Sequence, residues 1–155
     1  MTTKTPETRL AELGHTLPEV VPPVAAYLPT VRSGSHVYVS GQLPVVGGEL
    51  RATGKVGADV DPEQAKELAA VCALNAIAAI KAEVGELSRV KRVVKVVGFV
   101  ASDPSFTGQP QVINGASELF TEVFGEAGKH ARSAVGVAVL PLNAPVEVEV
   151  IVEVD

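Results

Sequence analysis

The most regular part of the chain is its C-terminal quarter, which reads His130-Ala131-Arg132-Ser133-Ala134-Val135-Gly136-Val137-Ala138-Val139-Leu140-Pro141 and continues as Val146-Glu147-Val148-Glu149-Val150-Ile151-Val152. Valine recurs at every second position from Val146 to Val154, which is typical of a strand that buries one face. The small and apolar residues before it predict another strand over 134–140. A turn around Pro141-Leu142-Asn143 joins the two strands.

Arg132 lies at the mouth of the first of these strands. A guanidinium is always charged, so at the start of a core it needs an anionic partner or water. Glu147, on the second strand, is one such partner, and the two would then form a structural ion pair between adjacent strands. A bound anionic ligand is the other. The residues alone leave both interpretations open, because structural ion pairs often resemble sites.

Caps and periodicity predict the elements upstream. Asp61-Pro62-Glu63 marks a helix start with an Asp cap and a Pro in the first turn, and Gly85 marks its end. The expected elements are a short helix over 5–14, a proline-broken connector over 17–23, strands over 24–31 and 36–42, a turn at 47–48, a helix over 61–84, a strand over 91–101 and a helix over 109–124. The residues expected on one face of strand 91–101 are Val94, Val96, Gly98 and Val100.

This order, ββ-α-β-α-ββ, predicts an α+β fold in which two helices cover one face of a mixed sheet. The other face must then stay polar or be buried by further copies of the chain. Ile151 interrupts the glutamates on that face of the last strand, which indicates partial burial. We therefore expect a homo-oligomer whose sheets face inward.

Composition excludes several classes of protein. A chain of 155 residues with 46% hydrophobic and 20% charged residues is expected to be a single globular domain. Its net charge of −5 gives no general attraction for nucleic acid, whose binding depends on phosphate neutralisation. No apolar run is long enough for a membrane span, and the first residues carry no secretory pattern. We expect a cytoplasmic protein whose partners are neither nucleic acid nor membrane.

Motifs for metal, nucleophilic or phosphate chemistry are missing from the sequence. His15, His36 and His130 have no ligand spacing, and the single cysteine, Cys72, lies in an alanine-rich helix where a buried role is expected. There is no Gly-x-Ser-x-Gly motif and no phosphate-binding loop. Ser40 is interpreted as a strand-end hydroxyl bonded to backbone, and His130 as a surface-loop residue. We expect no metal and no cofactor.

Tyr27 and Asn114 are polar residues flanked by apolar ones, and they complete the candidates. Each also has a structural interpretation, Tyr27 as a partly buried ring with its hydroxyl in water and Asn114 as a residue on a helix surface. With these residues the chain resembles the reactive-intermediate deaminase family (Rid or YjgF-like, also labelled endoribonuclease L-PSP). The matching pieces are Tyr27, Asn114 and the segments 39–44 (Val-Ser-Gly-Gln-Leu-Pro), 131–135 (Ala-Arg-Ser-Ala-Val), 140–141 (Leu-Pro) and 146–148 (Val-Glu-Val).

The resemblance implies a chorismate-mutase-like α+β fold, assembled as a homotrimer whose sheets form a central barrel. It covers residues 24–155 as a Rid-like domain, with 1–23 as a helical and proline-rich extension typical of a longer subgroup. Sites in this family lie in clefts between subunits. Its best-known members hydrolyse enamines and imines to a 2-oxo acid and ammonia, so the implied partner is a small carboxylate-bearing metabolite.

Carried over by position, Arg132 would hold the substrate carboxylate, and Glu147 would orient or activate the attacking water. Tyr27, Gly41, Asn114 and Ala134 would line the cleft. Two positions depart from the family pattern. His130 replaces a residue that is often proline, and Ala134 stands where many members carry a cysteine, so no thiol is available there.

Two other functions are compatible with the same residues. One is a non-catalytic trimer that binds small carboxylates, with a regulatory role. The other is ribonuclease activity, which the family labels imply. The acidic balance of the chain, without an aromatic and basic surface, argues against ribonuclease activity.

Overall fold

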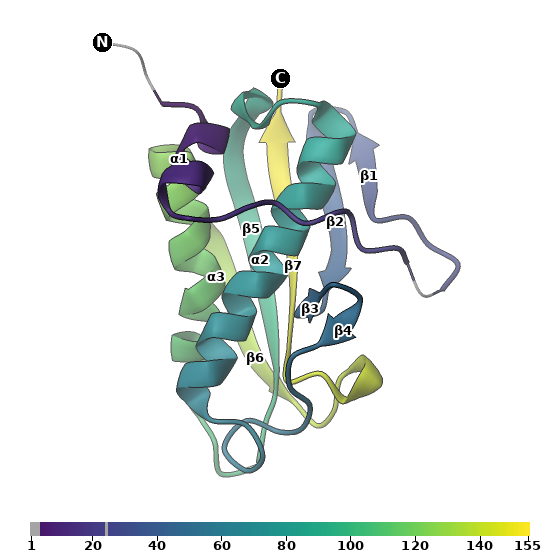
Figure 1. Ribbon diagram of the computed structural model, residues 1–155, viewed down its shortest axis with the longest axis vertical. Helices are drawn as coiled ribbons and strands as arrows, with labels where there is room; N and C mark the ends of the chain where they lie inside the picture. The colour runs from purple at the N-terminus through teal and green to yellow at the C-terminus, as the bar shows by residue number, and fades with distance from the viewer. Residues whose placement is uncertain (1–3, 24) are drawn as a thin grey trace.

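The computed structural model describes residues 4–23 and 25–155. Its main element is a mixed five-stranded sheet (Figure 1). The strands lie in the order β1–β2–β7–β5–β6. β5 and β6 run parallel, and the other neighbours run antiparallel. The strands of the sheet are β1 (Thr30–Ser33), β2 (His36–Gln42), β5 (Val90–Ala101), β6 (Ala131–Val137) and β7 (Val146–Val154). A separate hairpin of β3 (Val45–Val46) and β4 (Glu49–Leu50) turns at Gly47-Gly48, as predicted.

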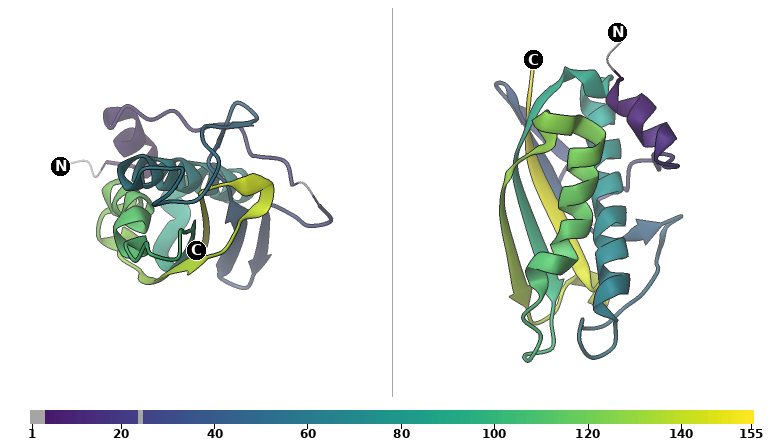
Figure 2. Two further views of the ribbon diagram at one scale, coloured as in Figure 1. Left: turned by 90° about the horizontal axis from the view of Figure 1, so that it is seen from below. Right: turned by 90° about the vertical axis from the view of Figure 1, so that its left-hand side faces the viewer.

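Two long helices, α2 (Pro62–Val84) and α3 (Gln109–Phe124), cover one face of this sheet (Figure 2). The short α1 (Pro6–Glu12) lies outside that layer, against α3 and the single turn η1 (Leu87–Arg89). Two further turns, η2 (Gly125–Gly128) and η3 (Pro141–Asn143), precede β6 and β7. The predicted α+β layer is therefore confirmed. None of the described helices is both long enough and apolar enough to cross a membrane.

Capping residues and short side chains explain the course of α2. The Asp61 carboxylate accepts a hydrogen bond from the Glu63 N–H at 2.8 Å, and Gly85 ends the helix at a φ of +90°. Cys72 is buried, as predicted. The buried alanines of α2 are Ala65, Ala69, Ala73, Ala76, Ala78 and Ala79. These small residues let the helix approach the sheet and α3 closely.

Glu7 ties α1 to the C-terminal end of α2. Its carboxylate accepts hydrogen bonds from Lys81 Nζ at 2.8 Å and from the Leu87 N–H at 3.0 Å. Partial burial opposes ionisation of Glu7, but these hydrogen bonds outweigh it and lower the pKa of the carboxyl. The first helix is therefore fixed by charge as well as by its one buried leucine, Leu10.

The first strand starts later than the sequence suggests. The expected strand covered 24–31, whereas β1 begins at Thr30 and runs to Ser33. Val24 lies outside the described residues. The Tyr27 N–H donates to the Ala25 carbonyl at 2.9 Å in a turn, and Pro29 has no N–H to donate. The Pro29 carbonyl can only accept, from the Ser40 N–H at 2.9 Å, and the regular pairing with β2 begins at Thr30.

Two features of β5 and β6 also differ from expectation. β6 covers Ala131–Val137 rather than 134–140, because it pairs with β5 from Lys95 onward, and Arg132 is therefore the second residue of the strand. In β5, a register shift between Val93 and Lys95 interrupts the alternation. Val93 is therefore fully buried and Val94, expected on the core face, is only half-buried.

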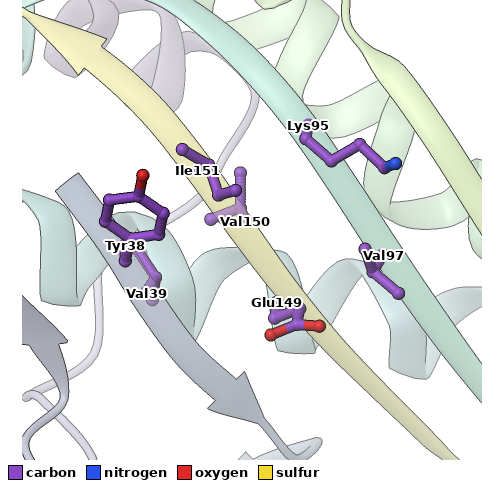
Figure 3. Close-up of a pocket in the computed structure, with 7 residues that line it drawn as sticks. All are labelled: Tyr38, Val39, Lys95, Val97, Glu149, Val150 and Ile151. Atoms are coloured by element: carbon purple, nitrogen blue, oxygen red, sulfur yellow. The ribbon is translucent and has the colours of Figure 1, made fainter. Parts of the chain in front are cut away.

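The face of the sheet away from α2 and α3 carries mixed side chains. β7 turns its valines toward the helices and its three glutamates and Ile151 to the other side. On the same side Val31, Tyr38 and Val135 are 51%, 48% and 44% exposed. A hollow of about 110 Å³ lies on this open face, and Figure 3 shows Tyr38, Lys95 and Glu149 among the residues that line it. None of the six predicted site residues lines it.

Candidate functional site

Arg132 points from the edge strand β6 toward α3. It is in register with Val96 in the parallel β5–β6 pair, and Val96 is fully buried under the helices. Because partners in register share a face, the arginine side chain lies on the helix-covered side. Its Nη1 donates to Asn114 Oδ1 at 2.7 Å and to Ser117 Oγ at 3.2 Å. Asn114 therefore binds the arginine directly and is not merely a helix-surface residue.

The rest of the Arg132 guanidinium is uncommitted. Nη1 carries two hydrogens, and both are used by the bonds to α3. Nε and Nη2 carry the other three and have no hydrogen-bond partner within residues 4–23 and 25–155. No described carboxylate lies within ion-pair distance of Arg132. The half-buried guanidinium thus has one edge, formed by Nε–H and Nη2–H, that can bind both oxygens of a carboxylate and that no described anion occupies.

His130 extends the polar cluster behind Arg132. Its Nε2 lies 2.9 Å from Ser117 Oγ, and its Nδ1 lies 2.6 Å from the Gly128 carbonyl oxygen. The ring meets Phe120 edge-on, with 6.0 Å between ring centroids. His130 lies in the loop before β6, as predicted, but it is half-buried and both ring nitrogens are bonded, so it is not a free surface residue.

Glu147 lies on the opposite face of the sheet. Its partner in β5 is Phe99, and both point to the open side. No described group donates a hydrogen bond to its carboxylate. The carboxylate lies against the backbone of Gly41, and a Cβ built on this glycine would lie 2.5 Å from Glu147 Oε1. Burial, and after it the negative charge of Glu149, raises the pKa of the Glu147 carboxyl.

Arg132 and Glu147 do not form the ion pair that the sequence left open. β5 separates their strands, so the strands are not adjacent, and the two side chains lie on opposite faces. That structural interpretation is wrong for the described chain. Neither charge serves to tie β6 to β7.

The six predicted site residues fall into three groups within one chain. Arg132, Asn114 and Ala134 gather between β6 and α3, since Ala134 pairs with Gly98 on the same face as Arg132. Gly41 and Glu147 gather on the open face of β2 and β7. Tyr27 is 45% exposed in the turn before β1, and β1 and β6 form the two edges of the sheet (Figure 1).

The sequence interpretation missed Ser117, although a signal was present. Ser117 follows Asn114 by three residues on α3, a spacing that places both on the same side of a helix. The interpretation of Ser40 as a backbone-bonded hydroxyl is confirmed, because its Oγ donates to the Leu28 carbonyl at 2.6 Å. Among the described residues, no three His, Cys, Asp or Glu side chains gather closely enough to hold a metal ion.

Comparison with known proteins connects this arrangement to a family. A family model described as "YjgF/chorismate mutase-like, putative endoribonuclease" matches residues 7–154. The chain belongs to this family. The resemblance to Rid and YjgF-like proteins seen in the sequence is thereby confirmed, and the match includes most of α1 as well as the whole sheet.

Several known proteins match this chain over nearly their full length. Protein TCP17 of Trypanosoma cruzi is 48% identical over 149 residues, which cover 94% of this chain and 92% of that protein. The solved structure of Atu1372, a protein of unknown function from Agrobacterium tumefaciens, is 52% identical with a TM-score of 0.91, covering 97% of this chain and 92% of that one. A Shewanella oneidensis MR-1 structure under the same endoribonuclease description is 38% identical with a TM-score of 0.95, covering 97% and 100%.

A more distant match is RidA from the Antarctic bacterium Psychrobacter sp. PAMC 21119. It is 30% identical with a TM-score of 0.59, and the match covers 88% of this chain and 94% of that one. The YjgF-family architecture is thus shared with a protein named RidA, at lower structural similarity than with the Agrobacterium and Shewanella proteins.

Proposed function

We propose that this YjgF-family protein hydrolyses reactive enamines and imines of small carboxylic acids. An enamine takes a proton on carbon to become the imine. Water then adds to the imine carbon, the carbon–nitrogen bond of the carbinolamine breaks, and a 2-oxo acid and ammonia are released. The imine carbon is already electrophilic, so the protein mainly needs to position the substrate and one water molecule.

The observation that carries the proposal is the free Nε–Nη2 edge of Arg132. Two side chains of α3 hold Nη1, and the other three N–H groups have no partner in the described chain. The planar fork matches the two oxygens of a carboxylate. A fixed, half-buried guanidinium without an anion is suited to bind the carboxylate of an imino acid.

Glu147 is the group that we propose for handling the water. Burial and the neighbouring Glu149 raise the pKa of its carboxyl, so its carboxylate is a better base than an ordinary surface glutamate. No described group donates a hydrogen bond to this carboxylate, so its oxygens remain free to accept one from water.

A site that uses both Arg132 and Glu147 requires more than one copy of the chain, because the two lie on opposite faces of one sheet. The exposed apolar residues of the open face, among them Tyr38 and Val135, favour burial against further copies. We propose a homotrimer with its sites between subunits and with Tyr27 contributed across the junction.

The test uses a pyridoxal-phosphate enzyme to generate the imine in the presence of this protein. Ammonia and 2-oxo acid should appear faster than without it, and Arg132→Ala should remove at least about 99% of the acceleration, since buried charge-assisted bonds contribute strongly. Full activity in Arg132→Ala, or no acceleration with any imine, overturns the proposal.

The shared site has its own test. Arg132→Ala and Glu147→Gln chains, each inactive alone, are unfolded together and refolded as mixed oligomers. If the two residues come from different copies, some mixed sites contain both native side chains and activity returns. No recovery in the mixture contradicts a site built from both copies.

Binding without turnover is the second candidate. Ala134 supports it, because this methyl group stands beside Arg132 where a reactive side chain would be placed. This candidate predicts that small carboxylates raise the melting temperature in an Arg132-dependent way while no ammonia is released. RNA cleavage by highly purified protein, lost in Arg132 or Glu147 variants, would instead support the endoribonuclease description of the family.

A further inference from the structure

The protons in the cluster behind Arg132 can be assigned from hydrogen-bond chemistry. The Gly128 carbonyl oxygen can only accept, so His130 Nδ1, 2.6 Å away, must carry the proton. In the neutral imidazole Nε2 then holds the lone pair, and it lies 2.9 Å from Ser117 Oγ. The Ser117 hydroxyl therefore donates to His130, and its oxygen accepts from Arg132 Nη1 at 3.2 Å.

These bonds form one directed chain from Arg132 through Ser117 and His130 to the Gly128 carbonyl. A hydroxyl that donates becomes a better acceptor, so the bond from Ser117 to His130 strengthens the bond from Arg132 to Ser117. The second Nη1 hydrogen goes to Asn114 at 2.7 Å. Because the guanidinium is planar, two fixed directions at Nη1 fix where the Nε–H and Nη2–H groups point.

Local structure explains why this cluster forms. Asn114, Ser117 and Phe120 are three residues apart along α3, so they lie on the same side of the helix and face the start of β6. Phe120 supports the His130 ring edge-on. A Cβ at Gly128 would collide with the Phe120 carbonyl oxygen, so this glycine allows η2 to approach α3 and to present its own carbonyl to His130.

We infer that Ser117 and His130 are positioning residues, which orient Arg132 so that only its Nε–Nη2 edge is presented to a ligand carboxylate. The inference rests on the proposed function for one point, that Arg132 binds a carboxylate. Ser117 bonds to the arginine directly, and His130 acts on it through Ser117. Their loss should therefore weaken carboxylate binding and raise KM, with kcat changed much less.

The test measures binding of pyruvate, a simple 2-oxo acid, to the full-length protein by calorimetry. Ser117→Ala and His130→Leu should each raise the Kd about tenfold, as for loss of one hydrogen bond to a charged group. The double variant should be little worse than either single one, because both changes interrupt the same chain. Kd values equal to that of the unmodified protein in both single variants overturn the inference.

Conservative variants separate positioning from simple damage to the fold. Ser117→Thr keeps the hydroxyl and His130→Gln keeps an acceptor in place of Nε2, so both should bind pyruvate within about threefold of the unmodified protein. Thr121→Val is the matched control, since the Thr121 hydroxyl on the same helix donates to the Ser117 carbonyl at 3.1 Å and does not touch Arg132. Its Kd should not change. Tenfold losses in the conservative variants or in this control would show a merely structural role.

Nitrogen-15 NMR of the unmodified protein gives a readout that needs no variant. His130 should show the Nδ1–H tautomer. An Nε2–H tautomer contradicts the inference. The proposed function fails separately, namely if Arg132→Ala binds pyruvate as well as the unmodified protein. If Arg132→Ala abolishes binding and the Ser117 and His130 variants change nothing, only the positioning role is lost.

Discussion

The carboxylate of Glu147 occupies the space in which a side chain at position 41 would lie. A Cβ on Gly41 would come within 2.5 Å of Glu147 Oε1 and 2.9 Å of its Cδ. Gly41 has no left-handed backbone angle, so the position needs glycine for space and not for conformation. Gly41 lies in the irregular part of β2 between Val39 and Gln42, and there its backbone lies against the Glu147 side chain. The two residues therefore form one unit.

Gly41→Ala should impair imine hydrolysis while leaving the fold intact. The obstructing atoms belong to the end of a flexible side chain, so we expect a stability loss of only about 1 kcal/mol. The displaced carboxylate should lower the rate of ammonia release at least about tenfold. Thermal unfolding and the imine assay measure the two effects. Alanine at position 41 should cost no stability in a Glu147→Ala background, and full activity of Gly41→Ala would contradict the pairing.

Glu147→Gln should stabilise the protein at neutral pH. A carboxyl whose pKa is raised by folding contributes stability that is complete below its unfolded pKa and is lost as the pH rises through the raised value. Glutamine does not ionise, so the variant does not lose this stability as the pH rises. The variant should melt at a higher temperature than the unmodified protein at about pH 7, and the difference should vanish below about pH 4. Glu153→Gln, on the same face of β7, controls for the loss of one negative charge.

Glu7→Gln should have the opposite pH dependence. The hydrogen bonds from Lys81 and Leu87 outweigh partial burial and lower the pKa of Glu7, so its contribution is present above the unfolded pKa and is lost as the pH falls through the lowered value. The variant should lose about 1 kcal/mol at neutral pH and little at about pH 3. Denaturant unfolding at both pH values measures this.

The matched control for that change is Glu12→Gln on the same helix. Glu12 pairs with Lys4 at 3.0 Å, but both side chains are at least half exposed, at 50% and 59%. An exposed pair contributes little, so this variant should be nearly neutral. Equal losses in the two variants would argue against a special role of Glu7 in fixing α1.

Gly115→Ala should be among the most damaging small changes. In most helix interiors this substitution gains about 1 kcal/mol. Here the new Cβ would overlap the Lys66 backbone carbonyl of α2, which cannot rotate away. We expect a net loss of roughly 3 kcal/mol in the free energy of unfolding. Gly85→Ala meets no atom within 4 Å and strains only a φ of +90°, so it should lose about 1 kcal/mol.

Local patterns predicted most of the elements because they depend on neighbours in sequence. The cap at Asp61, the stop at Gly85 and the valine alternation from Val146 to Val154 coincide with the ends of α2 and β7. The boundaries of β1 and β6 were wrong, since partner strands determine where pairing begins. The shift at Val93 in β5 has no signal in its run of valines.

The candidate site was harder to predict because its relationships are spatial. The sequence identified Arg132 and Glu147 as candidates. It did not indicate that β5 lies between their strands or that their side chains lie on opposite faces of the sheet. Asn114 was named as a cleft residue, but its hydrogen bond to Arg132 was not predicted. Ser117 was missed, although it stands one helical turn further on, and His130 was misjudged because its second partner is the carbonyl of Gly128.

The alanines along α2 have a consequence for how this chain tolerates sequence change. A buried alanine can lose only its methyl group, at about 1 kcal/mol in a helix, whereas any larger residue adds atoms where α2 already lies close against the sheet and α3. In most proteins the interior is damaged by truncation. At these six positions of α2 there is little left to truncate, and the limit on variation is an upper bound on side-chain size.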